Sequence, residues 1–188
     1  QDQLKGLTRL LESMPDLQRS LAPGVYDGDT SQSARRKIRD GSRLILSNPD
    51  MLHRAILPYH GRWSRFLGNL RYVIVDEIHS YRGIFGSNVA NVLRRLRRVA
   101  RHHRAAAGPG AEEAPEPQFL SSSATIQNPV ELAERLTGVA TRAVTEDGSP
   151  RGPRWFVLWN PPFSDDARVE RRSSNVEAME LLVRLVRE

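Results

Sequence analysis

The chain has 188 residues, of which 39% are hydrophobic and 27% are charged, as is typical of a folded globular protein. It has no cysteine, which excludes a disulfide framework and a thiolate zinc site, and no stretch approaches the roughly 18 apolar residues of a membrane span. No signal peptide is visible, so we expect no membrane partner and a cytoplasmic setting. The net charge is +6 and almost every basic residue is Arg, which fits a nucleic-acid partner and a GC-rich coding bias equally well.

The first half of the chain alternates predicted helices with two short predicted strands. Leucines at helical spacing begin the series, Pro15 ends the first helix, and Thr30 or Ser31 is placed to cap a helix that Gly41 ends. Pro49 suits the first turn of another helix. The elements expected here are a helix over 1–14, a strand over 24–26, a turn over 27–30, a helix over 33–40, a strand over 44–46 and a helix over 51–57.

The second half contains the most apolar strand of the chain. Tyr72–Val75 is an apolar, β-branched run of the kind that fills a strand buried on both faces. The helix after it places apolar residues on one face and most of its arginines, from Arg94 to Arg104, on the other. Residues 105–117 are rich in Ala, Gly, Pro and Glu and predict a mobile loop. The elements expected here are a strand over 72–75, a helix over 87–104, a strand over 118–120, a helix over 129–136 closed by Gly138, a strand around 143–144, a turn at 147–148, a strand over 155–159 and a helix over 175–188.

This alternation predicts an α/β fold, in which a parallel sheet carries helices on both faces and chemistry lies at the carboxyl ends of the strands. Two predicted strand ends carry polar clusters, namely Asp76, Glu77 and His79 after one strand and Ser123 and Thr125 after another. An Asp in this place can hold the Mg²⁺ of a nucleoside triphosphate, and a neighbouring Glu can orient or deprotonate a water. An acidic pair alone is by default the start of a solvated loop. Serines at a strand end can hydrogen-bond to their own backbone, and a lone His is more often structural.

The order of these motifs resembles that of superfamily 2 helicases of the DEAD/DEAH type, which implies a RecA-like fold. Residues 76–79 resemble motif II, residues 123–125 motif III and residues 47–50 motif Ib, while residues 1–3 look like the end of motif Ia. The chain is more narrowly similar to the DNA repair helicases of the mitomycin repair factor A type. That likeness is carried by residues 81–87, 91–98, 119–129, 147–152 and 158–162, so it covers essentially the whole chain.

The resemblance implies roles for both clusters in an ATP-dependent helicase. Asp76 would hold Mg²⁺ through water, Glu77 would position and polarise the attacking water, and both would lie against ATP. His79 would contact the segment of Ser123 and Thr125 and link the nucleotide site to the DNA track. In-line attack on a γ-phosphate needs charge neutralisation and an oriented water more than covalent help, which suits these groups.

On the nucleic-acid side, the resemblance implies that Asp27, Gly28, Thr30, Asn48 and Arg82 grip the backbone of single-stranded DNA, with 3′–5′ movement. Contacts to phosphate and sugar make binding depend on salt more than on sequence. The run 27–30 is equally compatible with a simple turn. Most of the Arg-rich helix is expected to be a solvated outer face, because Arg stems shield apolar surface well.

The chain departs from the family because no Gly-x-x-x-x-Gly-Lys-Ser/Thr phosphate loop occurs in it, and the motifs of the second helicase lobe are missing too. We therefore expect an N-terminally truncated fragment whose partner is the remainder of its own helicase chain. Residues 1–150 would be a partial first RecA-like lobe, and residues 151–188 a linker and the beginning of the second lobe. Alone, these residues are expected to hydrolyse ATP negligibly.

Two other functions stay open at this point. A non-catalytic nucleic-acid-binding module would use the Arg-rich surface and be indifferent to Asp76 and Glu77. A metal-dependent hydrolase would use Asp76, Glu77 and His79 as ligands, although two adjacent ligands suit a strand end poorly.

Overall fold

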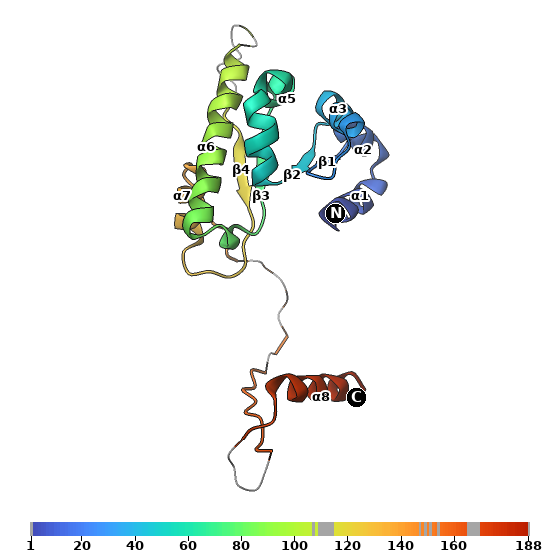
Figure 1. Ribbon diagram of the computed structural model, residues 1–188, viewed down its shortest axis with the longest axis vertical. Helices are drawn as coiled ribbons and strands as arrows, with labels where there is room; N and C mark the ends of the chain where they lie inside the picture. The colour runs from blue at the N-terminus through green and yellow to red at the C-terminus, as the bar shows by residue number, and fades with distance from the viewer. Residues whose placement is uncertain are drawn as a thin grey trace. The chain divides into compact units, whose positions relative to one another are not determined.

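The computed structural model describes residues 2–106, 108, 115–146, 148, 150, 152–153, 155–164 and 170–187. The chain divides into two compact units, residues 1–144 and residues 145–188, and most of their helices and strands are labelled in Figure 1. Among the described residues, no helix is both long enough and apolar enough to cross a membrane.

The first unit opens with three helices and a parallel pair of strands. These elements are α1 (Asp2–Glu12), α2 (Pro15–Leu21), β1 (Gly24–Tyr26), α3 (Gln32–Gly41) and β2 (Ile45–Ser47). Both strands are confirmed within a residue, and Ser31 caps α3 by accepting a hydrogen bond from the Ala34 N–H. The sequence did not predict α2, because Pro15 indicates only the end of α1. Pro15 is the first residue of α2, where its fixed φ and missing N–H are tolerated.

A run of short helices leads from β2 to the second pair of strands. It comprises α4 (Pro49–Met51), the π-helix η1 (Leu52–Ile56), the 3₁₀ helix η2 (Leu57–Trp63) and α5 (Ser64–Gly68). Pro49 is the first residue of α4, as the sequence predicted, and the structure adds Asn48 as its cap. The predicted helix over 51–57 is too short, since helical structure continues past Pro58 to Gly68.

The second pair of parallel strands is β3 (Tyr72–Val75) and β4 (Gln118–Ser121), in a register that pairs Val75 with Ser121. Between them lie η3 (Ile78–Ser80) and the long helix α6 (Gly83–Ala105), and α7 (Pro129–Thr137) follows β4. Gly138 ends α7 in the left-handed conformation, as predicted. Of the predicted loop over 105–117, residues 107 and 109–114 lie outside the described residues.

Helix α6 joins two hydrophobic clusters into one core. Val89, Ala90 and Leu93 pack with Val75 and the α7 residues Ala133 and Leu136. One turn further on, Leu96 packs with the second cluster, which contains Tyr26, Ile56, Leu57, Trp63 and Leu67. The rings of Tyr26 and Trp63 meet edge to face at 5.0 Å, so β1 is fixed against η2. The core therefore holds the carboxyl ends of β1 and β3 on one framework.

Two predictions about burial are wrong in this unit. Tyr72 and Ile74 are 62% and 71% exposed, because helices among the described residues cover only the other face of β3, which bears Val73 and Val75. Arg104, expected on the outer face of α6, is buried and donates to the Leu70 carbonyl at 2.9 Å. The α/β fold class with parallel strands is confirmed by these elements and their topology.

The second unit contains α8 (Ser174–Arg187), which confirms the predicted helix over 175–188. The strands predicted around 143–144 and over 155–159 are wrong. Val144 and Phe156 are 89% and 95% exposed, and no described strand lies beside either segment to accept their backbone hydrogen bonds. Asp147 of the predicted turn at 147–148 lies outside the described residues.

Candidate functional site

The two polar clusters predicted from the sequence meet at the carboxyl ends of β3 and β4. Because Val75 pairs with Ser121, the next residues, Asp76 and Ser122, leave the two strands side by side. The ladder continues beyond the strands, since the Ser122 N–H donates to the Val75 carbonyl at 3.1 Å and the Ile78 N–H donates to the Ser122 carbonyl at 3.0 Å. The backbone itself therefore fixes the spacing of the two clusters.

Asp76 is the centre of the hydrogen bonds in this site. Its Oδ1 accepts from the Ser122 hydroxyl and, at 3.0 Å, from the Glu77 N–H, while its Oδ2 accepts from the amide of Gln3 in α1. An ionised carboxylate has about four acceptor positions. Three donors leave room for a water, so Asp76 fits a hydrated Mg²⁺ held through water better than a cation enclosed by protein ligands.

Glu77 lies in a strained corner between β3 and η3. Its φ of 53° and ψ of 44° are left-handed, a conformation that costs a non-glycine residue on the order of 1 kcal/mol or more. The conformation turns the chain so that the Ile78 N–H reaches the Ser122 carbonyl. The Glu77 carboxylate stays open to solvent at 64% exposure, which suits a group that must approach a water.

His79 bridges the acidic pair and the β4 end through one nitrogen. Its Nδ1 accepts from the Ala124 N–H at 3.1 Å and also lies 3.1 Å from Glu77 Oε2. A nitrogen that accepts from an N–H carries no proton, whereas one that binds a carboxylate must donate a proton. The imidazole therefore accepts from the Ala124 N–H when Nδ1 carries no proton, and donates to the Glu77 carboxylate when Nδ1 carries one.

The structure adds residues that the sequence interpretation missed. Ser122 and Ala124 make the contacts to the acidic cluster, while Ser123 and Thr125 are exposed and make no hydrogen bond within the described part of the chain. The strand register was the missing signal for Ser122. Gln3 lies in residues 1–3, which resemble the end of motif Ia, but the sequence interpretation did not predict its contact with Asp76, 73 residues away.

The predicted DNA contacts at 27–30 form a tightly bonded turn. The Thr30 hydroxyl lies 2.7 Å from Asp27 Oδ1 and 3.0 Å from the Val25 carbonyl, and it accepts from the Asp27 N–H at 3.0 Å. The Asp29 N–H donates to Asp27 Oδ1 at 3.1 Å. The hydrogen bond from Thr30 lowers the pKa of Asp27 most, against a smaller opposing effect of desolvation. Asp27 and Thr30 thus organise the turn, and Gly28 lies at its exposed tip.

Asn48 and Arg82 each follow a strand in a different pair. Asn48 comes after β2, beside the 27–30 turn, and its Oδ1 caps α4 by accepting from the Met51 N–H at 2.9 Å. Arg82 comes after β3 and η3 and precedes α6, with its side chain exposed. The predicted DNA set is therefore distributed over the carboxyl ends of both strand pairs.

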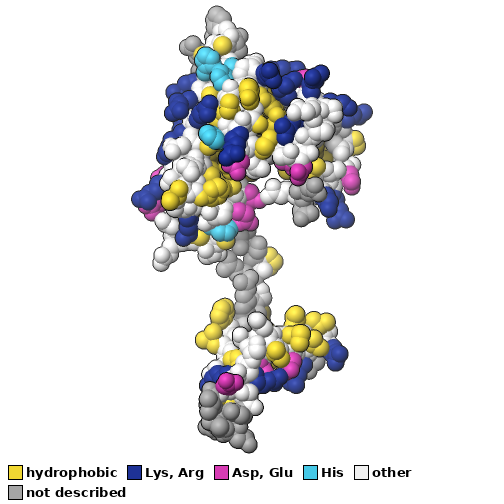
Figure 2. Space-filling view, viewed as in Figure 1, with side chains coloured by type: hydrophobic (Ala, Val, Ile, Leu, Met, Phe, Trp, Pro, Cys, Tyr) yellow, Lys and Arg dark blue, Asp and Glu magenta, His cyan; other side chains and the backbone are white. Residues whose placement is uncertain are grey.

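The arginines of α6 are largely engaged within the fold. Arg94 donates to the Arg135 carbonyl at 2.8 Å, and Arg97 donates to the Gly138 carbonyl at 2.9 Å. Arg97 and Arg101 both bind Glu116, and these two guanidinium groups lower the pKa of the Glu116 carboxyl. Figure 2 shows Lys and Arg side chains scattered over the visible surface rather than gathered in one patch. These contacts weaken the case for a module that binds nucleic acid through the Arg-rich helix.

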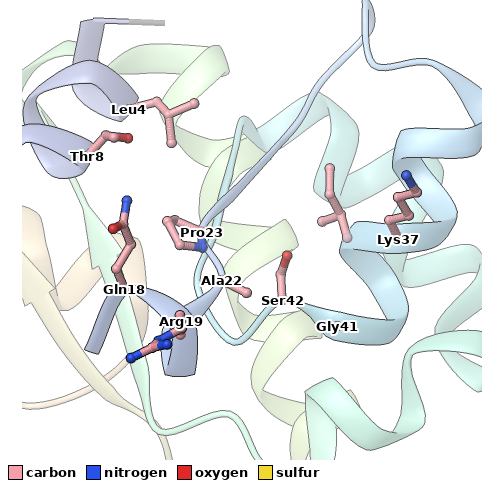
Figure 3. A pocket seen from close by; sticks show the side chains of 10 residues that line it. Leu4, Thr8, Gln18, Arg19, Ala22, Pro23, Lys37, Gly41 and Ser42 are labelled. Atoms are coloured by element: carbon pink, nitrogen blue, oxygen red, sulfur yellow. The ribbon is translucent and has the colours of Figure 1, made fainter. Parts of the chain in front are cut away.

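The structure offers a groove away from this site and no cluster of metal-ligand side chains in the described residues. The groove in Figure 3 is lined by residues of α1, α2 and α3, among them Leu4, Gln18 and Lys37. It also contains Ala22 and Pro23, which precede β1, so it adjoins the amino end of that strand. Within the described ranges, no group of three His, Cys, Asp or Glu side chains is placed to hold a metal ion.

Comparisons with known proteins point to one family. The model of the DEAD/DEAH box helicase family matches residues 1–133. "Uncharacterized ATP-dependent helicase YprA" of Bacillus subtilis is 43% identical over 181 residues, which are 96% of this chain and 22% of that protein. "ATP-dependent helicase HRQ1" of Saccharomyces cerevisiae is 38% identical over 187 residues, which are 99% of this chain and 16% of that protein. The chain thus spans about a fifth of the length of these curated relatives.

Solved structures give the same result at the level of the fold. The crystal structure of DUF1998 helicase MrfA bound to DNA and AMPPNP matches with a TM-score of 0.83 and 41% identity, over 98% of this chain and 24% of that chain. The structure of MrfA bound to DNA alone matches with a TM-score of 0.83 and 42% identity, over 96% of this chain and 22% of that chain.

Proposed function

Because this chain belongs to the DEAD/DEAH box helicase family, we propose that it is part of an ATP-dependent DNA repair helicase that moves 3′–5′ along single-stranded DNA. The observation that carries the proposal is the junction of two strand ends, where Ser122 contacts Asp76 and Ala124 contacts His79. This junction joins an acidic, solvent-open site to a neighbouring polar segment. The solved structure of the similar protein MrfA with DNA and AMPPNP supports ATP and DNA as ligands.

In this proposal Asp76 and Glu77 act on ATP. Asp76 holds Mg²⁺ through water, using the acceptor capacity left by its three donors. Bound Mg²⁺ supplies charge neutralisation for the phosphates. Glu77, whose carboxylate is exposed at the corner after β3, orients and polarises the attacking water.

His79 and the segment from Ser122 to Thr125 connect the nucleotide to DNA. A change at Glu77 alters the bond that His79 makes, and the Ala124 N–H responds because both use the same imidazole nitrogen. Ser123 and Thr125 follow in the same segment with hydroxyls that bind no other described side chain, and they carry the change toward the DNA side.

DNA would contact the segments that follow β1, β2 and β3. Gly28 is the exposed tip of the turn that Asp27 and Thr30 organise, Asn48 keeps its amide nitrogen free of any described partner, and Arg82 presents an exposed guanidinium. Contacts of this kind reach phosphate and sugar, so affinity depends on salt more than on sequence.

The rest of the motor lies, in this proposal, in other parts of a longer helicase chain. Residues 1–150 form part of a first RecA-like lobe, and residues 151–188 form a linker and the beginning of the second. A phosphate-binding Gly-Lys loop does not occur in these 188 residues. The isolated 188 residues are therefore expected to hydrolyse ATP negligibly.

Replacing Glu77 by Gln in the full-length protein tests this proposal. Gln keeps the size of the side chain but cannot take a proton from water, so DNA-stimulated ATP hydrolysis should fall by at least about a hundredfold. Equilibrium binding of a fluorescent ATP analogue should stay close to that of the unmodified protein. A variant that hydrolyses ATP at a near-normal rate would remove Glu77 from its role.

A further inference from the structure

Arg35 of α3 holds the 27–30 turn, although the proposed function gives this side chain no role. Its Nη2 donates to the Asp27 carbonyl at 2.9 Å and to the Gly28 carbonyl at 3.2 Å. Its guanidinium carbon lies 5.4 Å from the centroid of the Tyr26 ring. One side chain therefore ties the exposed turn both to α3 and to the end of β1.

Arg35 differs from the exposed cations Arg36 and Lys37 of α3 in its burial, and from the half-buried Arg39, which pairs with Asp40, in its contact with the turn. It is half-buried, and its Nε is buried without a hydrogen-bond partner in the described part of the chain. A buried donor without a partner disfavours this placement, so the two carbonyl bonds and the contact with the Tyr26 ring must hold the side chain there. Arg36, the next residue, is exposed and makes no hydrogen bond with the turn among the described residues.

The hydrogen bonds of Arg35 affect the charge that the turn presents to a phosphate. The carbonyl oxygens of Asp27 and Gly28 carry partial negative charge, which opposes the approach of an anion. Arg35 draws both oxygens toward α3 and offsets their charge. Asp27 itself is held by Thr30 and by the Asp29 N–H, so its carboxylate is engaged within the turn.

Resting on the proposed contact between this turn and DNA, we propose that Arg35 is a positioning residue for the DNA backbone. It keeps the turn in the conformation that accepts a phosphate and does not itself contact DNA. Without Arg35 the turn samples other conformations, and the apparent affinity falls by the fraction of time spent in the competent one.

The test compares Arg35→Ala with Arg36→Ala in the full-length protein. Binding of a fluorescein-labelled single-stranded oligonucleotide is measured by anisotropy over a series of salt concentrations. Arg35→Ala should raise the Kd about tenfold with an unchanged slope of log K against log salt, because no phosphate contact is lost. Arg36→Ala removes the same charge from the same helix and should change the Kd by less than about twofold.

Two further measurements separate positioning from a general loss of structure. In Arg35→Ala the KM for DNA in the ATPase assay should rise while kcat at saturating DNA stays unchanged. The Arg35→Lys substitution keeps the positive charge and is less disruptive to folding than Arg35→Ala. It should still raise the Kd severalfold, because an ammonium lacks the planar fork and ring stacking of a guanidinium.

Four results would overturn the inference. A salt slope reduced by about one phosphate in Arg35→Ala would show a direct DNA contact. Equal effects of Arg35→Ala and Arg36→Ala would show a charge effect alone. An unchanged Kd in both Arg35 variants, with weaker binding in Arg82→Ala, would reject the role of Arg35 and leave the proposed function intact. An unchanged Kd in each of the Arg35 and Arg82 variants would reject both the role of Arg35 and the proposed function.

Discussion

Replacing Ser122 by Ala tests whether the hydroxyl beside Asp76 supports ATP hydrolysis. The Ser122 Oγ donates to Asp76 Oδ1 and accepts from the Glu77 N–H at 3.3 Å. A hydrogen bond to a charged group contributes about 1.5–3 kcal/mol, but water replaces part of it here because both side chains are exposed. We therefore expect a loss of about 1 kcal/mol, which corresponds to a roughly fivefold lower kcat/KM for ATP. The assay is DNA-stimulated phosphate release by the full-length protein over a range of Mg·ATP concentrations.

Ser121→Ala is the matched control for this prediction. Ser121 is the last residue of β4, and its side chain makes no hydrogen bond in the described structure. The two variants lose the same hydroxyl one residue apart, so only the contact with Asp76 distinguishes them. Ser121→Ala should keep kcat/KM within about twofold of the unmodified protein. Equal losses in the two variants, or no loss in Ser122→Ala, would refute the assigned role of Ser122.

Two further predictions concern stability. Gly86→Ala should lower the free energy of unfolding, because the new Cβ would lie 2.3 Å from the Tyr81 carbonyl oxygen, a backbone atom. Such a clash costs about 1–3 kcal/mol, against a helical gain of about 0.5–1 kcal/mol. Gly6→Ala, in open space within α1, should instead raise the free energy of unfolding by up to about 1 kcal/mol, and denaturant unfolding of both variants checks the opposite signs. Burial, and then the neighbouring His60 and His102, lowers the pKa of His103 below its usual 6.5. The unfolded chain therefore binds more protons below about pH 6.5, and stability falls there with falling pH. In the His103→Gln variant, Tm should fall less steeply with falling pH. An unchanged dependence of Tm on pH would contradict this prediction.

The sequence predicted those elements whose ends carry their own chemical signals. Ser31 and Asn48 cap helices with side-chain oxygens, and Gly138 ends α7 with a positive φ. Each signal acts between residues a few positions apart, so it can be recognised in the sequence without the tertiary structure. The same local logic failed at Pro15, since a proline that cannot continue one helix can begin the next.

Burial could not be predicted from apolar composition alone. Tyr72 and Ile74 are as apolar as the buried Val75, and Phe156 lies in a run that reads as a strand. A strand also needs a neighbour that accepts its hydrogen bonds, and a buried face needs a second layer. Both requirements depend on which distant segments lie alongside, and among the described residues none covers Ile74 or pairs with residues 155–159.

In the candidate site, too, the sequence alone could not predict which residue makes a key contact. Residues 121–123 are all Ser, so composition cannot tell which hydroxyl reaches Asp76. The pairing of Val75 with Ser121 decides it, because side chains alternate along a strand and the residues one step further, Asp76 and Ser122, leave the sheet together. A slip of the register by one residue would place Ser121 or Ser123 there and turn Ser122 to the other face. That register depends on the packing of Val73, Val75 and Phe119 against α6 and α7, so the hydrogen bonds of the acidic pair are set by the core beneath it.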